Sequence, residues 1–176
     1  MTESNKTSPS QPRRSSDVSH WDMETDIAVV GFGGAGSCAA IEAADAGYEV
    51  IIFELARAIG GSTAMSSAEI YMGGSGGTRV QQACCFEDSS EDMFNYLMMQ
   101  HGPQADEAKV RAYVDGGPSH FDWLVEQGVP FKESFLDERV VEPMTDDCLI
   151  YSGNEKSWPE VEHCKPAPRA HVVQQT

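Results

Sequence analysis

The stretch "DIAVVGFGGAGSCAA", residues 26–40, decides the fold of this chain. Its β-branched apolar run, residues 27–30, predicts a short buried strand. Gly31, Gly33 and Gly36 follow directly as G-x-G-x-x-G. The first glycine permits a tight turn, the second lets the backbone approach a pyrophosphate, and the third lets a helix pack closely on the strand. This order is typical of a chain that wraps around a dinucleotide.

The residues after the glycine turn complete a βαβ unit. Residues 35–46 are rich in alanine and predict a helix, for which Gly47 is a fitting end. Residues 50–53 predict a second buried strand. Such a unit is right-handed and its strands are parallel. We therefore expect an α/β protein with a Rossmann-like βαβ core over 26–54, incomplete in this chain and followed by further helices.

Glu54 ends the second predicted strand, where an acidic side chain can accept hydrogen bonds from a ribose 2′-hydroxyl. The same carboxylate would repel a 2′-phosphate, which argues against NADP. A second glycine element, "GGSTA" at 60–64, follows shortly afterwards and suits a ligand longer than NAD. We therefore expect FAD as the cofactor. An NAD-binding module and a plain flexible loop at 60–64 are the alternatives.

Several stretches of the sequence resemble a known family. The stretch from Asp26 to Glu54 together with "GGSTA" is similar to the amino-terminal part of the fumarate reductase/succinate dehydrogenase flavoproteins. Within that family the likeness is greatest to 3-ketosteroid dehydrogenases and their FAD-binding relatives. "YMGGSGGT", "SSEDMFNYL", "WLVEQGVPF" and "YSGNE" also resemble that group. The resemblance implies hydride transfer between a flavin and a carbon–carbon bond next to a carbonyl, as in a 3-ketosteroid.

The resemblance also implies which residues bind the cofactor. The pyrophosphate would lie against the glycine turn, the ribose against the acid, the phosphates and ribityl chain against the second glycine element, and the isoalloxazine near a pair of serines. The residues at the pyrophosphate would be Gly31, Gly33, Gly34, Ala35 and Gly36, and the residue at the ribose would be Glu54. The residues at the phosphates and the ribityl chain would be Gly60, Gly61, Ser62, Thr63 and Ala64, and those near the isoalloxazine would be Ser66 and Ser67. Relatives tend to have Ser-Gly-Gly where this chain has Ser66-Ser67-Ala68, so side chains here are expected to crowd the flavin.

The family's proteins are considerably longer, and their catalytic tyrosines and a further glycine-rich FAD element lie in later segments. We therefore expect an amino-terminal part or truncated form, and the sequence assigns no catalytic residue. A non-catalytic FAD-binding fragment is the alternative to an enzyme, and oligomerisation or a completing chain segment is expected. Tyr71 and Tyr151 are expected to pack rather than to transfer protons.

The remaining sequence predicts one partial FAD-binding domain over 23–176 behind a polar, disordered tail over 1–22. Within the domain we expect a glycine-rich loop over 59–78, a helical part over 89–128 and irregular structure over 129–176. The helical part contains three predicted helices, over 90–100, 105–114 and 119–127, the last two separated by Gly116-Gly117-Pro118.

Charge and composition narrow the class of function. The 12 basic and 28 acidic residues give a net charge of −16, which would repel nucleic acid and anionic lipid. No apolar run is long enough to span a bilayer, and the histidines lack the spacing of a zinc site. The odd number of cysteines, 5, favours reduced thiols and a cytoplasmic protein.

Overall fold

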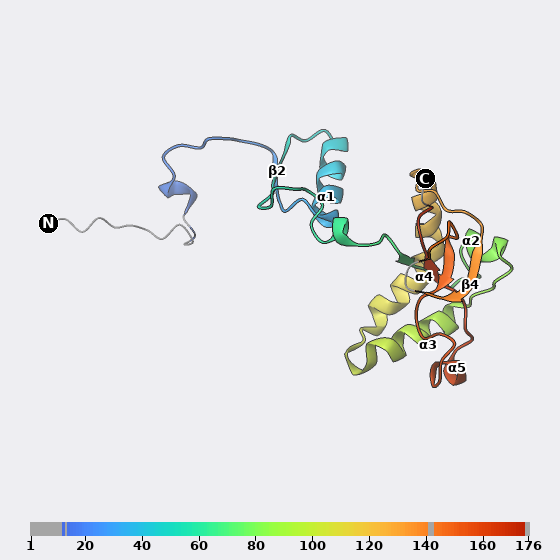
Figure 1. The fold of residues 1–176 in the computed structure, drawn as a ribbon. Helices are drawn as coiled ribbons and strands as arrows, with labels where there is room; N and C mark the ends of the chain where they lie inside the picture. The colour runs from blue at the N-terminus through green and yellow to red at the C-terminus, as the bar shows by residue number, and fades with distance from the viewer. Residues whose placement is uncertain (1–11, 13, 141–142, 175–176) are drawn as a thin grey trace. The chain divides into compact units, whose positions relative to one another are not determined.

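The computed structural model describes residues 12, 14–140 and 143–174, which divide between Met65 and Ser66 into two compact units (Figure 1). Residues 1–11 and 13 of the expected tail lie outside the described residues. The described remainder of the tail contains a short 3-10 turn, η1, at Ser15–Asp17. The domain expected over 23–176 thus extends across both units, and each unit is described by itself below.

The first unit contains the βαβ arrangement, and its bounds agree with the sequence to within a residue. Strand β1 covers Ile27–Val30, helix α1 covers Gly34–Asp45, and strand β2 covers Val50–Phe53 (Figure 1). The strands are parallel, with Ile27 opposite Val50. A 3-10 turn, η2, at Thr63–Met65 ends the unit.

The second unit combines a four-stranded sheet with helices. The sheet order is β3-β6-β5-β4, in which β4 and β5 are parallel and the other pairs are antiparallel. Its strands are β3 Ile70–Tyr71, β4 Phe135–Arg139, β5 Leu149–Tyr151 and β6 Ala170–His171. Its helices are α2 Arg79–Ala83, α3 Ser90–His101, η3 Gly102–Gln104, α4 Glu107–Glu126 and α5 Glu160–His163. The whole chain is therefore a mixed α/β structure.

The expectation of irregular structure over 129–176 is wrong, because β4, β5, α5 and β6 all lie there. These strands have two to five residues, too few for a periodic apolar pattern to stand out. They are held by pairing with distant residues: Ile70 of β3 lies opposite His171 of β6. Pairing of this kind depends on tertiary contacts that a local sequence pattern does not encode.

The two helices expected on either side of Pro118 form the single helix α4, which starts at the side-chain cap of Asp106. Pro118 lacks an N–H group and therefore cannot donate a backbone hydrogen bond within the helix. The helix nevertheless continues through Pro118, because the packing of its other residues outweighs the loss of this bond. Val114, Gly117 and Phe121 are buried along the helix. Gly117 lies so close to Gly73 that a β-carbon on it would be 2.9 Å from the carbonyl oxygen of Gly73.

Charged and polar side chains meet inside the second unit. The Arg169 guanidinium donates from Nε to Asp88 Oδ2 and from Nη2 to Asp88 Oδ1, both at 2.7 Å, and both side chains are almost fully buried. Beside them His171 is fully buried, with Nδ1 2.9 Å from the Arg169 carbonyl oxygen and Nε2 2.7 Å from Thr78 Oγ1. Burial lowers the pKa of His171 to about 4, so the imidazole is neutral near pH 7.

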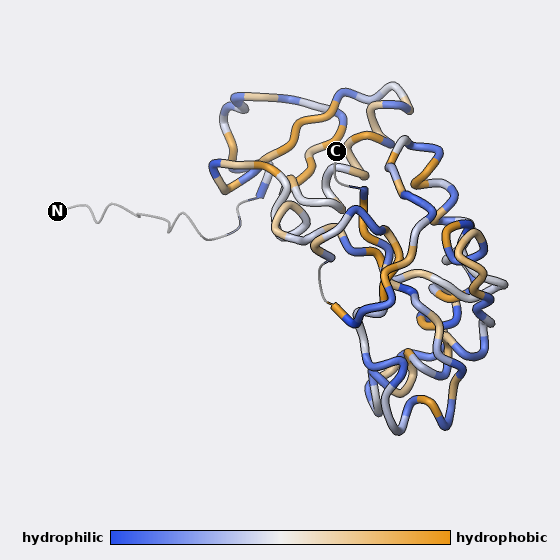
Figure 2. Tube along the Cα trace, turned by 45° about the vertical axis from the view of Figure 1, so that its right-hand side comes forward, coloured by the Kyte–Doolittle hydropathy of each residue, from blue (hydrophilic) through white to orange (hydrophobic). Residues whose placement is uncertain are grey.

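Hydrophobic and hydrophilic stretches of varying length are interspersed along the described chain (Figure 2). Within the described ranges no helix is both long enough and apolar enough to cross a membrane.

Neighbouring glycines of α4 provide a matched test of the packing at Gly73. Gly117→Ala is expected to lower the free energy of unfolding by about 1–3 kcal/mol, because the new methyl meets backbone atoms. Gly116→Ala has nothing within 4 Å of its new methyl and is expected to raise that free energy by about 0.5–1 kcal/mol. Urea unfolding of both variants measures this. Equal effects of the two substitutions would contradict the close approach.

The neutral His171 makes stability depend on pH. Because its folded pKa of about 4 lies below its ordinary value of 6.5, the unfolded chain takes up a proton first as the pH falls through this window. The folded state should therefore lose stability as the pH falls from 6.5 towards 4, by up to about 1.4 kcal/mol per pH unit from this group. Urea unfolding of the wild type and of His171→Gln across this range tests it, since the variant should have a shallower pH dependence.

Candidate cofactor site

The glycine turn between β1 and α1 has a backbone that only glycine permits at two positions. Gly31 has φ +98°, in the left-handed region. A β-carbon on Gly36 would lie 2.0 Å from the Gly31 carbonyl oxygen, well inside van der Waals contact. The missing side chain at Gly36 lets the first turn of α1 lie directly against the end of β1, and the positive φ of Gly31 forms the turn between them.

The amino terminus of α1 opens at this turn. The N-cap residue Gly33 makes no side-chain capping bond, and no acidic residue lies in the first turn. The Gly34 N–H donates to Thr63 Oγ1 at 3.3 Å, which is a long hydrogen bond to a neutral hydroxyl. Unpaired N–H groups and the helix dipole favour an anion at such an end, so this terminus fits a phosphate group.

The second glycine segment lies on the first. The Gly60 N–H donates to the Phe32 carbonyl oxygen at 2.7 Å, and Gly33 and Gly60 form an isolated parallel β-bridge. A β-carbon on Gly61 would lie 3.3 Å from the α-carbon of Gly33. Both Gly60 and Gly61 have positive φ, +108° and +54°. The two segments therefore form one cradle of backbone, in which added side chains would fill the space.

Glu54 joins the end of β2 to the glycine turn. Its Oε2 accepts the Phe32 N–H and its Oε1 accepts the Ala56 N–H, both at 2.7 Å. These two bonds, from Ala56 first and Phe32 second, lower the pKa of Glu54, so the side chain is a carboxylate at neutral pH. Each carboxylate oxygen keeps a further lone pair that can accept a hydrogen bond from a hydroxyl.

The structure brings together, within the first unit, all predicted cofactor residues from Gly31 to Ala64. Ser66 and Ser67 belong to the second unit, so their place relative to the cradle stays a prediction. Ser66 Oγ accepts the Ala68 N–H at 3.4 Å, and Ala68 has φ +59°. Ala68 thus adopts a left-handed conformation that favours glycine.

Phe32 is a residue of the cradle that sequence reasoning missed. Its N–H binds Glu54 and its carbonyl oxygen binds the Gly60 N–H, so it links both partners of the turn. Only backbone atoms take part, and any residue other than proline could supply them. The residue type therefore carried no signal.

Tyr71 and Tyr151 are packed in the second unit. The Tyr71 ring stacks on Tyr96 with centroids 6.0 Å apart, and the Tyr151 ring meets Phe135 edge-on at 5.9 Å. Burial raises the pKa of Tyr151 to about 12. Within the described parts of the chain, no three His, Cys, Asp or Glu side chains gather in a way that could hold a metal ion.

The sequence matches the family described as "FAD binding domain" over residues 26–158. The chain belongs to this family. FAD is accordingly its cofactor, and the open helix terminus, the glycine cradle and Glu54 all fit that group. The match covers the whole of β1, α1, β2 and the cradle.

Three relatives make the likeness more specific. The 3-oxo-5-alpha-steroid 4-dehydrogenase of Comamonas testosteroni is 35% identical over 164 residues, 90% of this chain and 30% of that protein. The NADH:fumarate oxidoreductase of Klebsiella pneumoniae is 34% identical over 59% of this chain and 11% of that protein. A crystal structure of 3-ketosteroid-Δ4-(5α)-dehydrogenase from Rhodococcus jostii RHA1 with 4-androstene-3,17-dione matches with a TM-score of 0.83 and 48% identity, over 93% of this chain and 34% of that one.

These similarities confirm the resemblance to ketosteroid dehydrogenases and fumarate reductases. The chain spans about a third of the length of the steroid dehydrogenases that it matches.

The contact between Gly36 and Gly31 gives a test of the cradle. Gly36→Ala should weaken FAD binding by about 100-fold or more, because its methyl would push the helix terminus away from the Gly31 carbonyl. Cys38→Ala, a change at an exposed position of the same helix, should leave binding unchanged. Fluorescence titration with FAD measures both. Similar affinity of Gly36→Ala and the wild type would contradict the assigned role of the turn.

Proposed function

We propose that this chain is the cofactor-binding portion of an FAD-dependent oxidoreductase with a Rossmann-like core. One observation carries the proposal: the two glycine segments lie against each other at the uncapped end of α1, and Glu54 is tied to the same turn. An NAD-binding module has no need of the second segment, whereas a longer dinucleotide does.

In this proposal each part of the cradle has a separate task. The first-turn N–H groups of α1 and the backbone of Gly60 and Gly61 hold the phosphates, with the Ser62 and Thr63 hydroxyls as additional donors. The Glu54 carboxylate accepts hydrogen bonds from the adenosine ribose. Ser66 and Ser67 lie towards the isoalloxazine. When bound, FAD supplies a two-electron acceptor for a hydride.

We further propose that the oxidoreductase acts on a carbon–carbon bond next to a carbonyl, in a flat ketone such as a 3-ketosteroid. The named steroid dehydrogenases among the relatives support this substrate class. Tyr71 is not proposed as a proton donor, because its hydroxyl already donates to Glu155 at 2.8 Å. The proposal assigns no catalytic residue to these 176 residues.

The sheet of the first unit favours a second candidate, in which the chain binds FAD but needs a further polypeptide for activity. Val30 and Phe53 are 87% and 49% exposed on a two-stranded parallel sheet. Parallel sheets are normally covered on both faces, and two strands are marginal on their own. A completing segment or self-association would bury these side chains.

Flavin binding by the purified chain tests the cofactor assignment. We expect the chain to retain flavin absorbance after incubation with FAD and gel filtration, and Glu54→Gln to bind it about 10-fold more weakly because the anionic acceptor is lost. Glu42→Gln on the exposed side of α1 is the charge-matched control and should bind like the wild type. A wild-type chain that stays colourless would refute FAD binding.

Activity separates the two candidates. If the FAD-loaded chain oxidises a saturated 3-ketosteroid with an artificial electron acceptor, the chain is sufficient as an enzyme. If the chain is inactive although it holds FAD, the second candidate is favoured and the cofactor assignment stands.

A further inference from the structure

The folded part of the first unit is short of positive charge. Residues 26–65 contain a single Lys or Arg, which is Arg57, and no other occurs between Arg14 and Arg79. The same residues contain five acids, which are Asp26, Glu42, Asp45, Glu49 and Glu54. An anionic ligand of this unit therefore meets a negative local field, and Arg57 is the unit's one side chain of opposite charge within 26–65.

Arg57 lies in the middle of a short loop, residues 55–59, between two parts of the cradle. Glu54, before the loop, accepts the Phe32 N–H at 2.7 Å, and Gly60, after the loop, donates its N–H to the Phe32 carbonyl oxygen at 2.7 Å. Both ends of the loop are thus held at one residue of the glycine turn. Because three residues of chain separate Arg57 from Gly60, their α-carbons lie within about 11 Å of each other. The cradle is therefore within range of a long, flexible side chain at this position.

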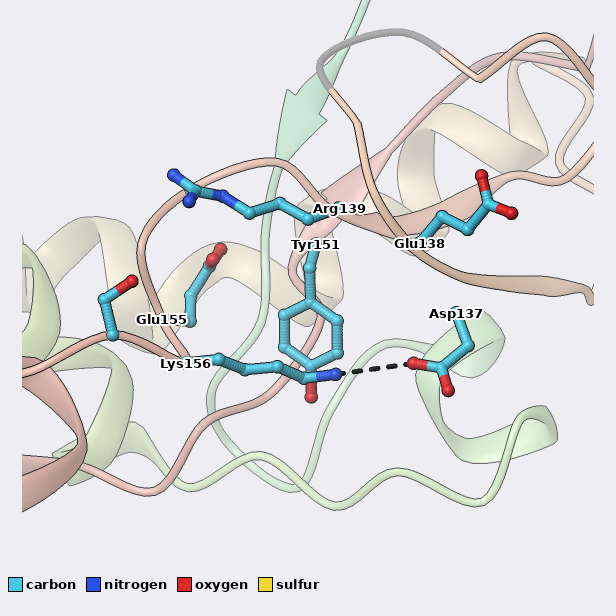
Figure 3. A pocket seen from close by; sticks show the side chains of 8 residues that line it. Asp137, Glu138, Arg139, Tyr151, Glu155 and Lys156 are labelled. Atoms are coloured by element: carbon cyan, nitrogen blue, oxygen red, sulfur yellow. Dashed lines mark hydrogen bonds and ion pairs between the residues drawn. The ribbon is translucent and has the colours of Figure 1, made fainter.

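The Arg57 side chain is exposed and forms no ion pair with the residues that the structure describes. Most cations of the second unit differ in this respect. Figure 3 shows an example, in which Lys156 Nζ lies 3.4 Å from Asp137 Oδ1. Six of the eight Lys and Arg residues after Ser66 have such a carboxylate partner: Arg79, Lys109, Arg111, Lys132, Lys156 and Arg169. The guanidinium of Arg57 instead keeps its donors available for a ligand.

The side chains on either side of Arg57 leave the loop open. Leu55 is fully exposed and Ile59 is 63% exposed. Arg57 can therefore turn towards the cradle without breaking a packed contact of these neighbours.

The pyrophosphate of FAD needs more positive charge than the backbone supplies. Each of its phosphate groups is negatively charged at neutral pH. The amino terminus of α1 offers about half an elementary charge, and the N–H and hydroxyl groups of the cradle are neutral. A guanidinium is always protonated, and its planar fork of N–H donors matches the oxygens of a phosphate. An arginine beside the cradle can thus supply the missing charge.

We propose that Arg57 is a cofactor-binding residue whose guanidinium pairs with the FAD pyrophosphate in the glycine cradle. This inference rests on the cofactor site of the proposed function and adds a residue to it. The pairing brings the loop of residues 55–59 onto the ADP half of the cofactor. It also favours ligands with a pyrophosphate over a flavin that lacks one.

Fluorescence titration of the full chain with FAD tests the proposal. Arg57→Gln should weaken FAD binding by about 10-fold, because a charge-assisted contact with phosphate is lost. Arg57→Lys keeps the charge and should bind FAD more tightly than Arg57→Gln. Arg139→Gln is the charge-matched control, because Arg139 is likewise exposed and forms no ion pair with the described residues (Figure 3). It should bind FAD like the wild type. Wild-type affinity in Arg57→Gln, or an equal loss in Arg139→Gln, would overturn the proposal.

Competition by ADP locates the contact on the cofactor. ADP has the pyrophosphate but no flavin, so its affinity should fall in Arg57→Gln by a factor similar to that for FAD. An unchanged affinity for ADP would overturn the assignment to the pyrophosphate. Higher ionic strength should weaken FAD binding more in the wild type than in Arg57→Gln, because salt screens the pair.

The same titrations separate this inference from the proposed function. A wild-type chain that binds no FAD refutes both. A wild-type chain that binds FAD, with no loss in Arg57→Gln, refutes the role of Arg57 and leaves the cofactor assignment in place.

Discussion

The approach of Gly36 to the Gly31 carbonyl oxygen is the constraint on which the first unit depends. With no β-carbon at position 36, α1 begins directly on the end of β1, and the Gly34 N–H of its first turn donates to Thr63 Oγ1. This position leaves room for Gly60 to bond with Phe32 and for Glu54 to bond with the same residue from the other side. One missing side chain thus determines where three separate segments meet, and the cofactor cradle is the result.

The sequence predicts the first unit well because its signals are local. A β-branched run, a glycine turn and an alanine-rich helix each follow from a few consecutive residues, and the observed bounds agree. The second unit is different. Pro118 has a strong local preference, but burial of Val114, Gly117 and Phe121 outweighs it. The ion pair of Asp88 and Arg169 joins residues more than eighty positions apart, and neither has a sequence neighbourhood that indicates a partner.

The same distinction applies to the cofactor site. The sequence predicts Gly31, Gly33, Gly36 and Glu54 as site residues because together they form a pattern that is typical of dinucleotide-binding turns. Phe32 could not be found, because it acts through backbone atoms alone. Ala68 is a third case. Its φ of +59° is a glycine-like backbone conformation that only the structure reveals.

Strand β6 has a consequence for how the chain folds. It is an inner strand of its sheet, between β3 and β5, yet it comes from residues 170 and 171, beyond the end of the family match at residue 158. During synthesis β3 emerges about a hundred residues before its partner, so it must wait unpaired until β6 leaves the ribosome. Contacts of such high sequence separation slow folding and extend the time for which an unpaired strand edge is exposed to other chains. An expression boundary drawn at the family match would remove β6 and leave β3 without its partner.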